Sequence, residues 1–160
     1  MKREILDVLE KNGRVSVTDL ATMLGEPENE VAAAISSMEK EKIICGYHTL
    51  INWDKACQDR VTALIEVKVT PQRDEGFDAI AEKIYNFKEV TSVYLMSGAF
   101  DLTVIIEGKT MKEVALFVGQ RLAVIDAVLS TATHFVLKKY KTEGVIIDET
   151  AEDDRLQVSP

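Results

Sequence analysis

The stretch Val93–Ile106 constrains the fold most, because it has the pattern of two strands joined by a tight turn. Apolar residues alternate with other residues on both sides of the turn, as half-buried strands require. The alternating apolar residues are Val93, Leu95, Leu102, Val104 and Ile106. Between the two runs lies a small-residue segment, Ser97-Gly98-Ala99, followed by Phe100-Asp101. The stretch therefore predicts an antiparallel hairpin that presents backbone N–H groups and one carboxylate at the edge of a sheet.

Two interpretations of this turn are open. A small ligand with an amino and a carboxylate group could bind the Asp101 carboxylate and the backbone N–H groups. Alternatively, Gly98 serves only the geometry of the turn, and Asp101 serves only to cap it. The local sequence fits both interpretations, so the flanking elements are needed to weigh them.

The elements around the hairpin follow the order βαββαβ. Val61 to Val69 alternates cleanly and stops at Thr70-Pro71, and apolar residues recur at helical spacing on both sides of the hairpin. The predicted elements are a strand at 61–69, a helix at 74–87, the hairpin strands at 90–97 and 101–107, a helix at 110–123 and a strand at 128–137. This order predicts a ferredoxin-like, α+β domain. Two helices cover only one face of its sheet, and we expect a second copy of the chain to cover the other.

The first 40 residues predict three short helices. The first covers residues 2–11, and Ser16 with Asp19 three residues later is a capping pattern for the second. Gly25 ends the second helix, and Pro27 suits the first position of the third. The inward stripe of the third helix is Val31, Ile35 and Met38. This arrangement is a helix-turn-helix pattern.

The segment 43–52 is strand-like and predicts a wing or linker strand, followed by a loop at 53–60. The predicted domains are therefore a winged helix-turn-helix unit at 1–45, a linker strand and loop at 46–60, a ferredoxin-like domain at 61–140, and an acidic C-terminal tail at 141–160.

The charge distribution limits the function. The net charge is −8, which argues against a protein that coats nucleic acid indiscriminately. No apolar run approaches the roughly 18–20 residues that span a bilayer, and the charged start is not a signal peptide. We therefore expect a cytoplasmic protein without a membrane partner. No catalytic triad, phosphate-binding loop or metal-ligand spacing is present, so we expect no enzyme, no cofactor and no metal.

The apolar and glycine positions of the N-terminal unit and linker resemble those of the Lrp/AsnC (feast/famine) transcription regulators. The second half resembles their RAM domain, so the resemblance covers about residues 2–140. The family's Gly-x-x-Asp motif resembles Gly98-Ala99-Phe100-Asp101, and its final-strand threonines resemble Thr131 and Thr133.

This resemblance implies a homodimer built through the RAM sheets, which commonly assembles further into tetramers or octamers. It implies operator DNA bound by the third helix and a small effector, usually an amino acid, in clefts between RAM domains. The implied effector-binding residues are Ser97, Gly98, Ala99, Phe100, Asp101, Thr131 and Thr133. Only Asp101, His134 and Tyr94 would offer chemistry near such a cleft, and they make no general acid–base pair, so an enzyme is not favoured.

The third helix departs from the family's pattern. Its outward residues are Asn29, Glu30, Ala32, Ala33, Ser36, Ser37 and Lys40, and all of them except Glu30 are candidates for DNA contact. The family usually places several arginines or lysines here, whereas this chain has one lysine and starts the helix with Glu26, Glu28 and Glu30. Acids favour a helix start but repel phosphate from it. We therefore expect each helix-turn-helix unit to bind DNA weakly. The alternative hypothesis is an effector-binding oligomeric sensor that has lost DNA binding.

Overall fold

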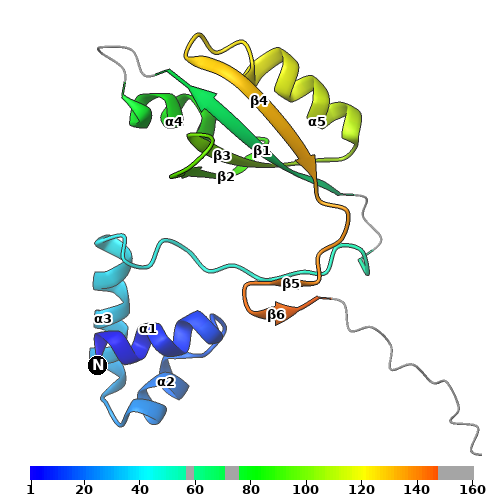
Figure 1. Cartoon of the computed structure of the whole chain (residues 1–160). Helices are drawn as coiled ribbons and strands as arrows, with labels where there is room; N and C mark the ends of the chain where they lie inside the picture. Colours follow the sequence, from blue (N-terminus) through cyan, green and yellow to red (C-terminus); the bar gives the residue numbers. More distant parts are fainter. Residues whose placement is uncertain (57–59, 71–75, 148–160) are drawn as a thin grey trace, which may run out of the picture. The chain divides into compact units, whose positions relative to one another are not determined.

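A computed structural model describes residues 1–56, 60–70 and 76–147. It divides into two compact units, Met1–Ile51 and Asn52–Pro160 (Figure 1). The two units are described separately below. Within the described residues, no helix has the length and apolar character needed to cross a membrane.

The first unit contains three helices around one core. They are α1 (Lys2–Lys11), α2 (Val17–Leu24) and α3 (Glu28–Lys40). The buried residues of this core are Ile5, Leu20, Ala21, Val31, Ala34 and Met38. Two residues of the predicted stripe on α3, Val31 and Met38, are therefore buried; Ile35 is half-buried, and Ala34 takes part in the core as well.

The predicted helix ends are largely confirmed. Ser16 Oγ accepts a hydrogen bond from the Asp19 N–H at 3.0 Å and donates one to Asp19 Oδ2 at 2.6 Å. The side chain thus satisfies a backbone donor that the first turn leaves without a partner. Gly25 ends α2 with a φ of 68°, a conformation that glycine adopts without strain. Pro27 is the residue before α3 rather than its first helical residue.

The strand expected at 43–52 is absent from the structure. The N–H groups of Ile43 and Ile44 both donate to the Met38 carbonyl, at 2.9 and 3.1 Å, and so finish α3 instead of entering a ladder. Residues 45–52 are irregular. A strand needs a partner for its backbone groups, and no other part of the described chain pairs with this segment. The apolar pattern of the segment was therefore misleading.

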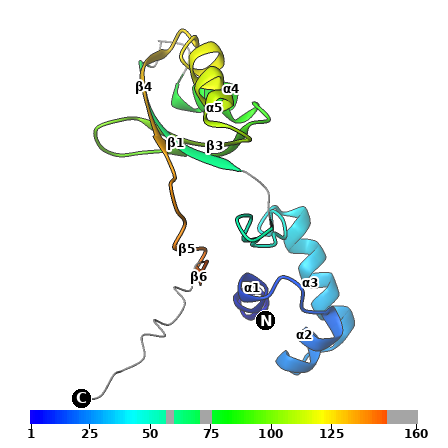
Figure 2. The same ribbon diagram turned by 90° about the vertical axis from the view of Figure 1, so that its right-hand side faces the viewer.

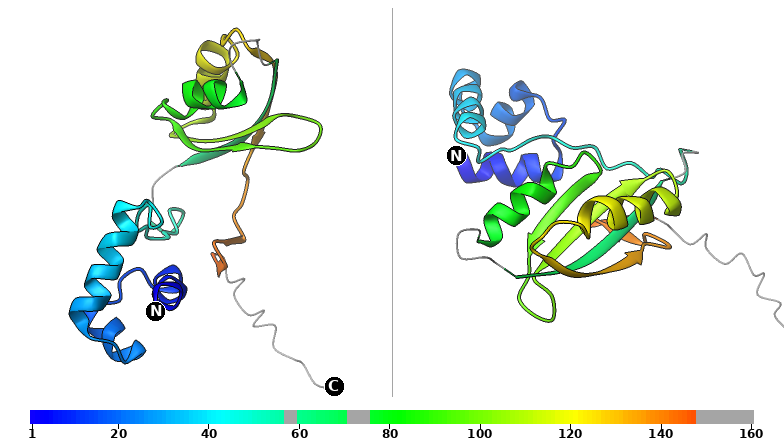
Figure 3. Two further views of the ribbon diagram at one scale, coloured as in Figure 1. Left: turned by 90° about the vertical axis from the view of Figure 1, so that its left-hand side faces the viewer. Right: turned by 90° about the horizontal axis from the view of Figure 1, so that it is seen from above.

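The second unit is the predicted ferredoxin-like domain. Its elements are β1 (Val61–Val69), α4 (Phe77–Tyr85), β2 (Val90–Leu95), β3 (Leu102–Gly108), α5 (Met111–Phe117), the π-helical turn η1 (Val118–Leu122) and β4 (Val128–Phe135). The strands form an antiparallel sheet in the order β2-β3-β1-β4. Both helices cover one face of this sheet (Figures 2 and 3).

Several boundaries differ from the sequence-based expectation. The helix predicted at 74–87 begins at Phe77, and positions 74 and 75 lie outside the described residues. The helix predicted at 110–123 changes to π-helix at Val118. Within the predicted tail, Lys141–Thr142 (β5) and Val145–Ile146 (β6) form a short hairpin.

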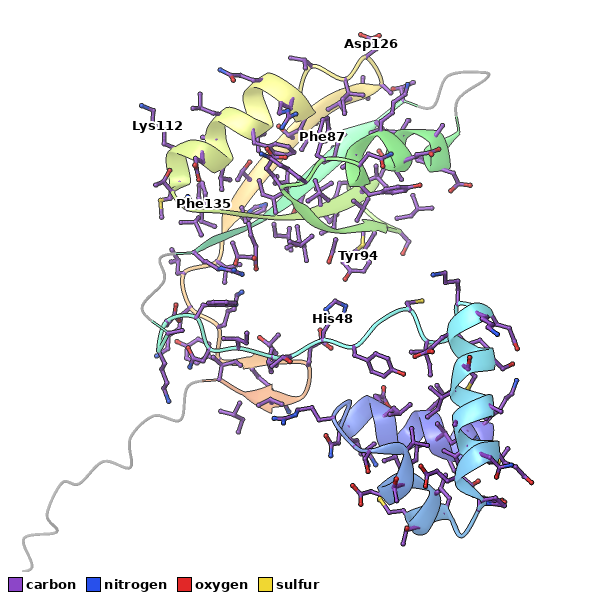
Figure 4. The ribbon with its side chains drawn as sticks, turned by 180° about the vertical axis from the view of Figure 1, so that it is seen from behind. His48, Phe87, Tyr94, Lys112, Asp126 and Phe135 are labelled. Atoms are coloured by element: carbon purple, nitrogen blue, oxygen red, sulfur yellow. The ribbon has the colours of Figure 1, made fainter. Side chains whose placement is uncertain are left out.

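The core of this unit lies between the sheet and its two helices. On β1 the predicted alternation is confirmed, because Ala63, Ile65 and Val67 are fully buried. Leu95, which the same rule places inside, is 61% exposed at the end of β2. Phe87 and Phe117 meet edge to face at 5.4 Å, and Phe87 lies in the helix layer in Figure 4. Edge-to-face contact is a preferred aromatic geometry.

The uncovered face of the sheet is more polar than the sequence suggested. Glu66 and His134 lie on it, with His134 Nε2 3.3 Å from Glu66 Oε1 across β1 and β4. Tyr94, whose neighbour Val93 faces the helices, lies on the uncovered side and is 53% exposed (Figure 4). The apolar contribution comes from Leu64 and Ile105, which are half-buried.

Candidate functional site

The exposed face of α3 is the candidate DNA-contacting surface. Asn29, Ala32, Ala33 and Lys40 are exposed, whereas Ser36 and Ser37 are half-buried. All six candidates therefore lie away from the buried stripe of α3. Asparagine can read adenine in the major groove, and small apolar side chains can contact thymine methyl groups. The face offers side chains of types that can contact base edges, but little charge for phosphate.

The end of α3 has its own electrostatic arrangement, which the sequence did not reveal. Ser37 Oγ hydrogen-bonds Glu41 Oε1, and Lys2 Nζ lies 3.6 Å from the same carboxylate oxygen. The hydrogen bond from Ser37, followed by the charge of Lys2, lowers the pKa of the Glu41 carboxyl. Glu41 thus stays ionised and pairs with Lys2, one of the few basic residues of the helix-turn-helix unit. Ser37 is committed to Glu41 as a donor, and Lys2 is partly neutralised.

Tyr47 packs against the same unit. Its hydroxyl donates to Glu39 Oε1 at 3.0 Å. Burial, together with this hydrogen bond, raises the pKa of Tyr47. A β-carbon on Gly13 would lie 3.6 Å from the Tyr47 ring, an ordinary contact distance. Tyr47 therefore ties the segment after α3 to the three-helix unit.

The candidate effector loop, Ser97–Asp101, joins β2 to β3 and projects from the sheet (Figure 2). Ser97, Gly98 and Ala99 are exposed, and Phe100 and Asp101 are half-buried. Gly98 has a φ of 145°, a conformation that other residues rarely adopt. Apart from the neighbours of Gly98 in the chain, no atom of the described residues lies within 4 Å of the position of a Gly98 β-carbon, so the backbone there is open.

Asp101 is engaged by β1. Its Oδ2 accepts a hydrogen bond from the Val69 N–H at 2.9 Å, and its own N–H donates to the Val67 carbonyl at 3.1 Å. Its carbonyl accepts from the Met96 N–H at 2.8 Å, closing the loop. The Asp101 carboxylate therefore holds the loop to the end of β1, a structural role that differs from the predicted capping of the hairpin turn itself. This role does not exclude the ligand interpretation, since one carboxylate oxygen can still accept other donors.

The two threonines of the candidate site do not lie beside the loop within one chain. Thr131 pairs with Val67 and Thr133 with Ile65, on the side of β1 opposite to β3. Two strand spacings, about 10 Å, therefore separate β4 from β3. Because they share a face with Val67 and Ile65, both threonines are half-buried on the helix side of the sheet. Within one chain, the loop and the threonines therefore lie on opposite sides of β1.

Two family profiles match the chain. One, described as a winged helix-turn-helix DNA-binding domain, matches residues 1–44. The other, described as the Lrp/AsnC ligand binding domain, matches residues 62–146. The fold and these matches define a DNA-binding transcription regulator with a ligand-binding domain. More specifically, the chain belongs to the Lrp/AsnC family.

Individual relatives agree with this assignment. The chain is 50% identical over 158 residues to the uncharacterised HTH-type transcriptional regulator YugG of Bacillus subtilis (strain 168), covering 98% of this chain and 95% of YugG. The structure of regulator NMB0573 from Neisseria meningitidis, a complex with L-Met, has a TM-score of 0.71 at 23% identity and covers 88% of this chain and 90% of its own. The leucine response regulatory protein LrpA of Mycobacterium tuberculosis has a TM-score of 0.75 at 20% identity, with coverage of 92% and 97%. These structures share the fold.

The comparisons also decide between the classes of function considered from the sequence. The matching families and relatives are transcription regulators rather than enzymes. They favour a DNA-binding regulator over a sensor that has lost the ability to bind DNA. Among the described residues, no group of three or more potential ligands is arranged to hold a metal ion.

Proposed function

We propose that this chain is a sequence-specific regulator whose DNA binding responds to an amino acid bound between the ligand-binding domains of a homo-oligomer. The observation that carries the proposal is the Ser97–Asp101 loop, with a solvent-open backbone at Gly98 and a carboxylate at Asp101. Turn N–H groups suit the carboxylate of an amino acid. The Asp101 carboxylate suits its ammonium group.

The separation of Asp101 from Thr131 and Thr133 supports a site shared between copies. These residues lie on either side of β1 within one chain, so a small effector would join the loop of one copy to the threonines of another. The Neisseria relative whose structure contains L-Met supports the amino-acid class. The dimer, and larger assemblies such as a tetramer or octamer, belong to this proposal.

The DNA-binding part of the proposal assigns base contacts to Asn29, Ala32, Ala33, Ser36, Ser37 and Lys40. Because phosphate contacts supply most non-specific affinity, a head with so few cations on α3 would bind DNA weakly alone. Joining two or more heads raises the affinity without new contacts at each head. Oligomerisation is therefore what makes operator binding effective in this proposal.

The test combines two measurements. Fluorescence anisotropy should show binding to a DNA fragment from the upstream region of the protein's own gene at low salt, and one or more of the twenty amino acids should change the dissociation constant. The same amino acid at 100 times its dissociation constant should stabilise the protein by about 2.7 kcal/mol. Asp101→Asn should weaken this response, whereas Asp78→Asn, the same change on the exposed start of α4, should not. No increase in anisotropy at low salt, with or without any amino acid, would refute the proposal.

A further inference from the structure

A cleft lies at the end of β3 that is remote from the candidate effector loop. It has a volume of about 300 Å³ and lies between the end of β3, the residues Lys88 and Glu89 just before β2, and the helical segment after Thr110. This volume is at the lower end of the range for small-molecule pockets. The loop joins β3 at Leu102, and the cleft adjoins Ile106–Gly108. At about 3.4 Å per residue, the two ends of β3 are roughly 20 Å apart. The cleft is therefore a different site from the Ser97–Asp101 loop.

The lining of the cleft has an apolar part and a charged part. Leu116 contributes exposed apolar surface above the buried Ile106, Val114 and Phe117, and the charged lining residues are Lys88, Glu89, Glu107, Glu113 and Arg121. The α5 helix approaches β3 closely here, because a β-carbon on Gly108 would lie only 3.2 Å from Val114 Cγ2. A pocket of this composition suits a small molecule with an apolar body and a polar end.

Glu89 has an unused acceptor. One carboxylate oxygen, Oε1, lies 2.8 Å from Arg121 Nη1. The other, Oε2, is buried and has no hydrogen-bond partner within the described part of the chain. Buried polar atoms almost always have a partner, and a carboxylate prefers a charged donor such as an ammonium group. The orphaned oxygen therefore indicates a missing N–H donor.

Arg121 supplies the complementary charge. Its guanidinium lies 5.0 Å from the centre of the Phe87 ring and carries five N–H donors, one of which contacts Glu89. The remaining donors suit a carboxylate. Arg121 and Gln120 belong to the π-helical turn Val118–Leu122, which lines the cleft. Such turns are rare and occur frequently at functional sites, so this irregularity is a second observation that points to a site here.

We infer that this cleft is a second small-molecule site, which takes a zwitterion with an apolar side chain. The ammonium group binds Glu89, the carboxylate binds Arg121, and the side chain lies against Leu116. The site is separate from the Ser97–Asp101 loop and is independent of the proposed function, since it requires neither DNA nor a second copy of the chain.

The structure also contains a reporter for the cleft. Trp53 is the single tryptophan of the sequence, and the Arg60 guanidinium lies 3.7 Å above its ring. Arg60 also pairs with Glu107 at 3.1 Å, and Glu107 lines the cleft. A ligand that displaces Glu107 should therefore change the emission of Trp53.

The experiment uses calorimetry and Trp53 fluorescence on the full chain without DNA. The probes are L-leucine, 3-methylbutylamine, which lacks the carboxylate, and 4-methylpentanoate, which lacks the ammonium group. L-Leucine should bind most tightly and the amine measurably. Glu89→Gln should lower the affinity for both at least tenfold, and Gln120→Trp, which fills the cleft from an exposed position, should abolish binding. Glu82→Gln makes the same charge change on the exposed surface of α4 and should leave affinity unchanged.

The outcomes separate this inference from the proposed function. If L-leucine and the amine bind Glu89→Gln and Gln120→Trp as they bind the parent protein, or if neither probe binds the parent, the cleft is not the site. A loss caused only by Asp101→Asn would place the ligand at the loop and would overturn the inference while leaving the proposed function intact. Loss in the two cleft variants, without an effect of amino acids on DNA binding, would support the cleft and count against the proposed function.

Discussion

The hydrogen bond from the Val69 N–H to Asp101 Oδ2 gives a quantitative test of how the loop is held. Val69 is 6% exposed and Asp101 half-buried, so truncation to Asp101→Ala leaves a largely dry N–H group without its acceptor. An unsatisfied buried donor costs about 1–3 kcal/mol. Because Asp101 is only half-buried, water can reach the site and we expect a loss of about 1–2 kcal/mol. Asp101→Asn keeps an oxygen acceptor, so its loss should be smaller.

The assay is urea unfolding followed by far-UV circular dichroism and Trp53 fluorescence. Protein concentration must be held constant, because an oligomer's apparent stability depends on it. Asp126→Ala is the matched control: Asp126 is exposed (Figure 4), and a surface change of this kind is normally within about 0.5 kcal/mol. If Asp101→Ala were as stable as Asp126→Ala, the bond to Val69 would not hold the loop, and this reasoning would be wrong.

Four further predictions follow from the structure. Gly98→Ala should destabilise the second unit by about 1–3 kcal/mol, because alanine is strained at a φ of 145°; an unchanged melting temperature would contradict this. Ser37→Ala should raise the Glu41 pKa toward its ordinary value, as followed by carboxyl NMR, because the Ser37 hydrogen bond is the main cause of the lowered pKa. The stability from that contact is present above the ordinary glutamate pKa and is lost as the pH falls through the lowered one. Ala32→Lys with Ala33→Lys should steepen the salt dependence of DNA binding by up to about 0.9 in log–log slope per new phosphate contact, whereas lysines at exposed Ala115 and Ala123 should not. Met38→Ala, at a fully buried position, should destabilise the three-helix unit by about 2–5 kcal/mol and be visible as lost helical signal.

The elements that the sequence predicted correctly are those governed by local rules. The alternation from Ala63 to Val67 predicts a strand because burial on one face of a sheet has a period of two. Ser16 and Gly25 mark helix ends because their own side chain or backbone conformation supplies what the ends require. Such signals do not depend on where the rest of the chain lies.

The features that the sequence did not predict depend on distant partners. The segment 43–52 has a strand-like composition, but its N–H groups at Ile43 and Ile44 bind the end of α3. The contact of Asp101 with Val69 joins residues 32 positions apart, so no local pattern reveals it. The pairing of Glu89 with Arg121 likewise joins residues 32 positions apart, and the cleft beside it was not among the predicted sites.

The acids at the start of α3 affect how the regulator is distributed in a cell. A genome offers about 10⁶–10⁹ non-specific sites that compete with an operator, and attraction to them is set mainly by phosphate contacts. If α3 contacts DNA as proposed above, Glu28 and Glu30 at its first turn lower that attraction for every sequence alike. Less of the protein is then sequestered on bulk chromosomal DNA. The concentration of unbound regulator follows its synthesis more closely, and fewer copies suffice to fill an operator that is recognised by base edges.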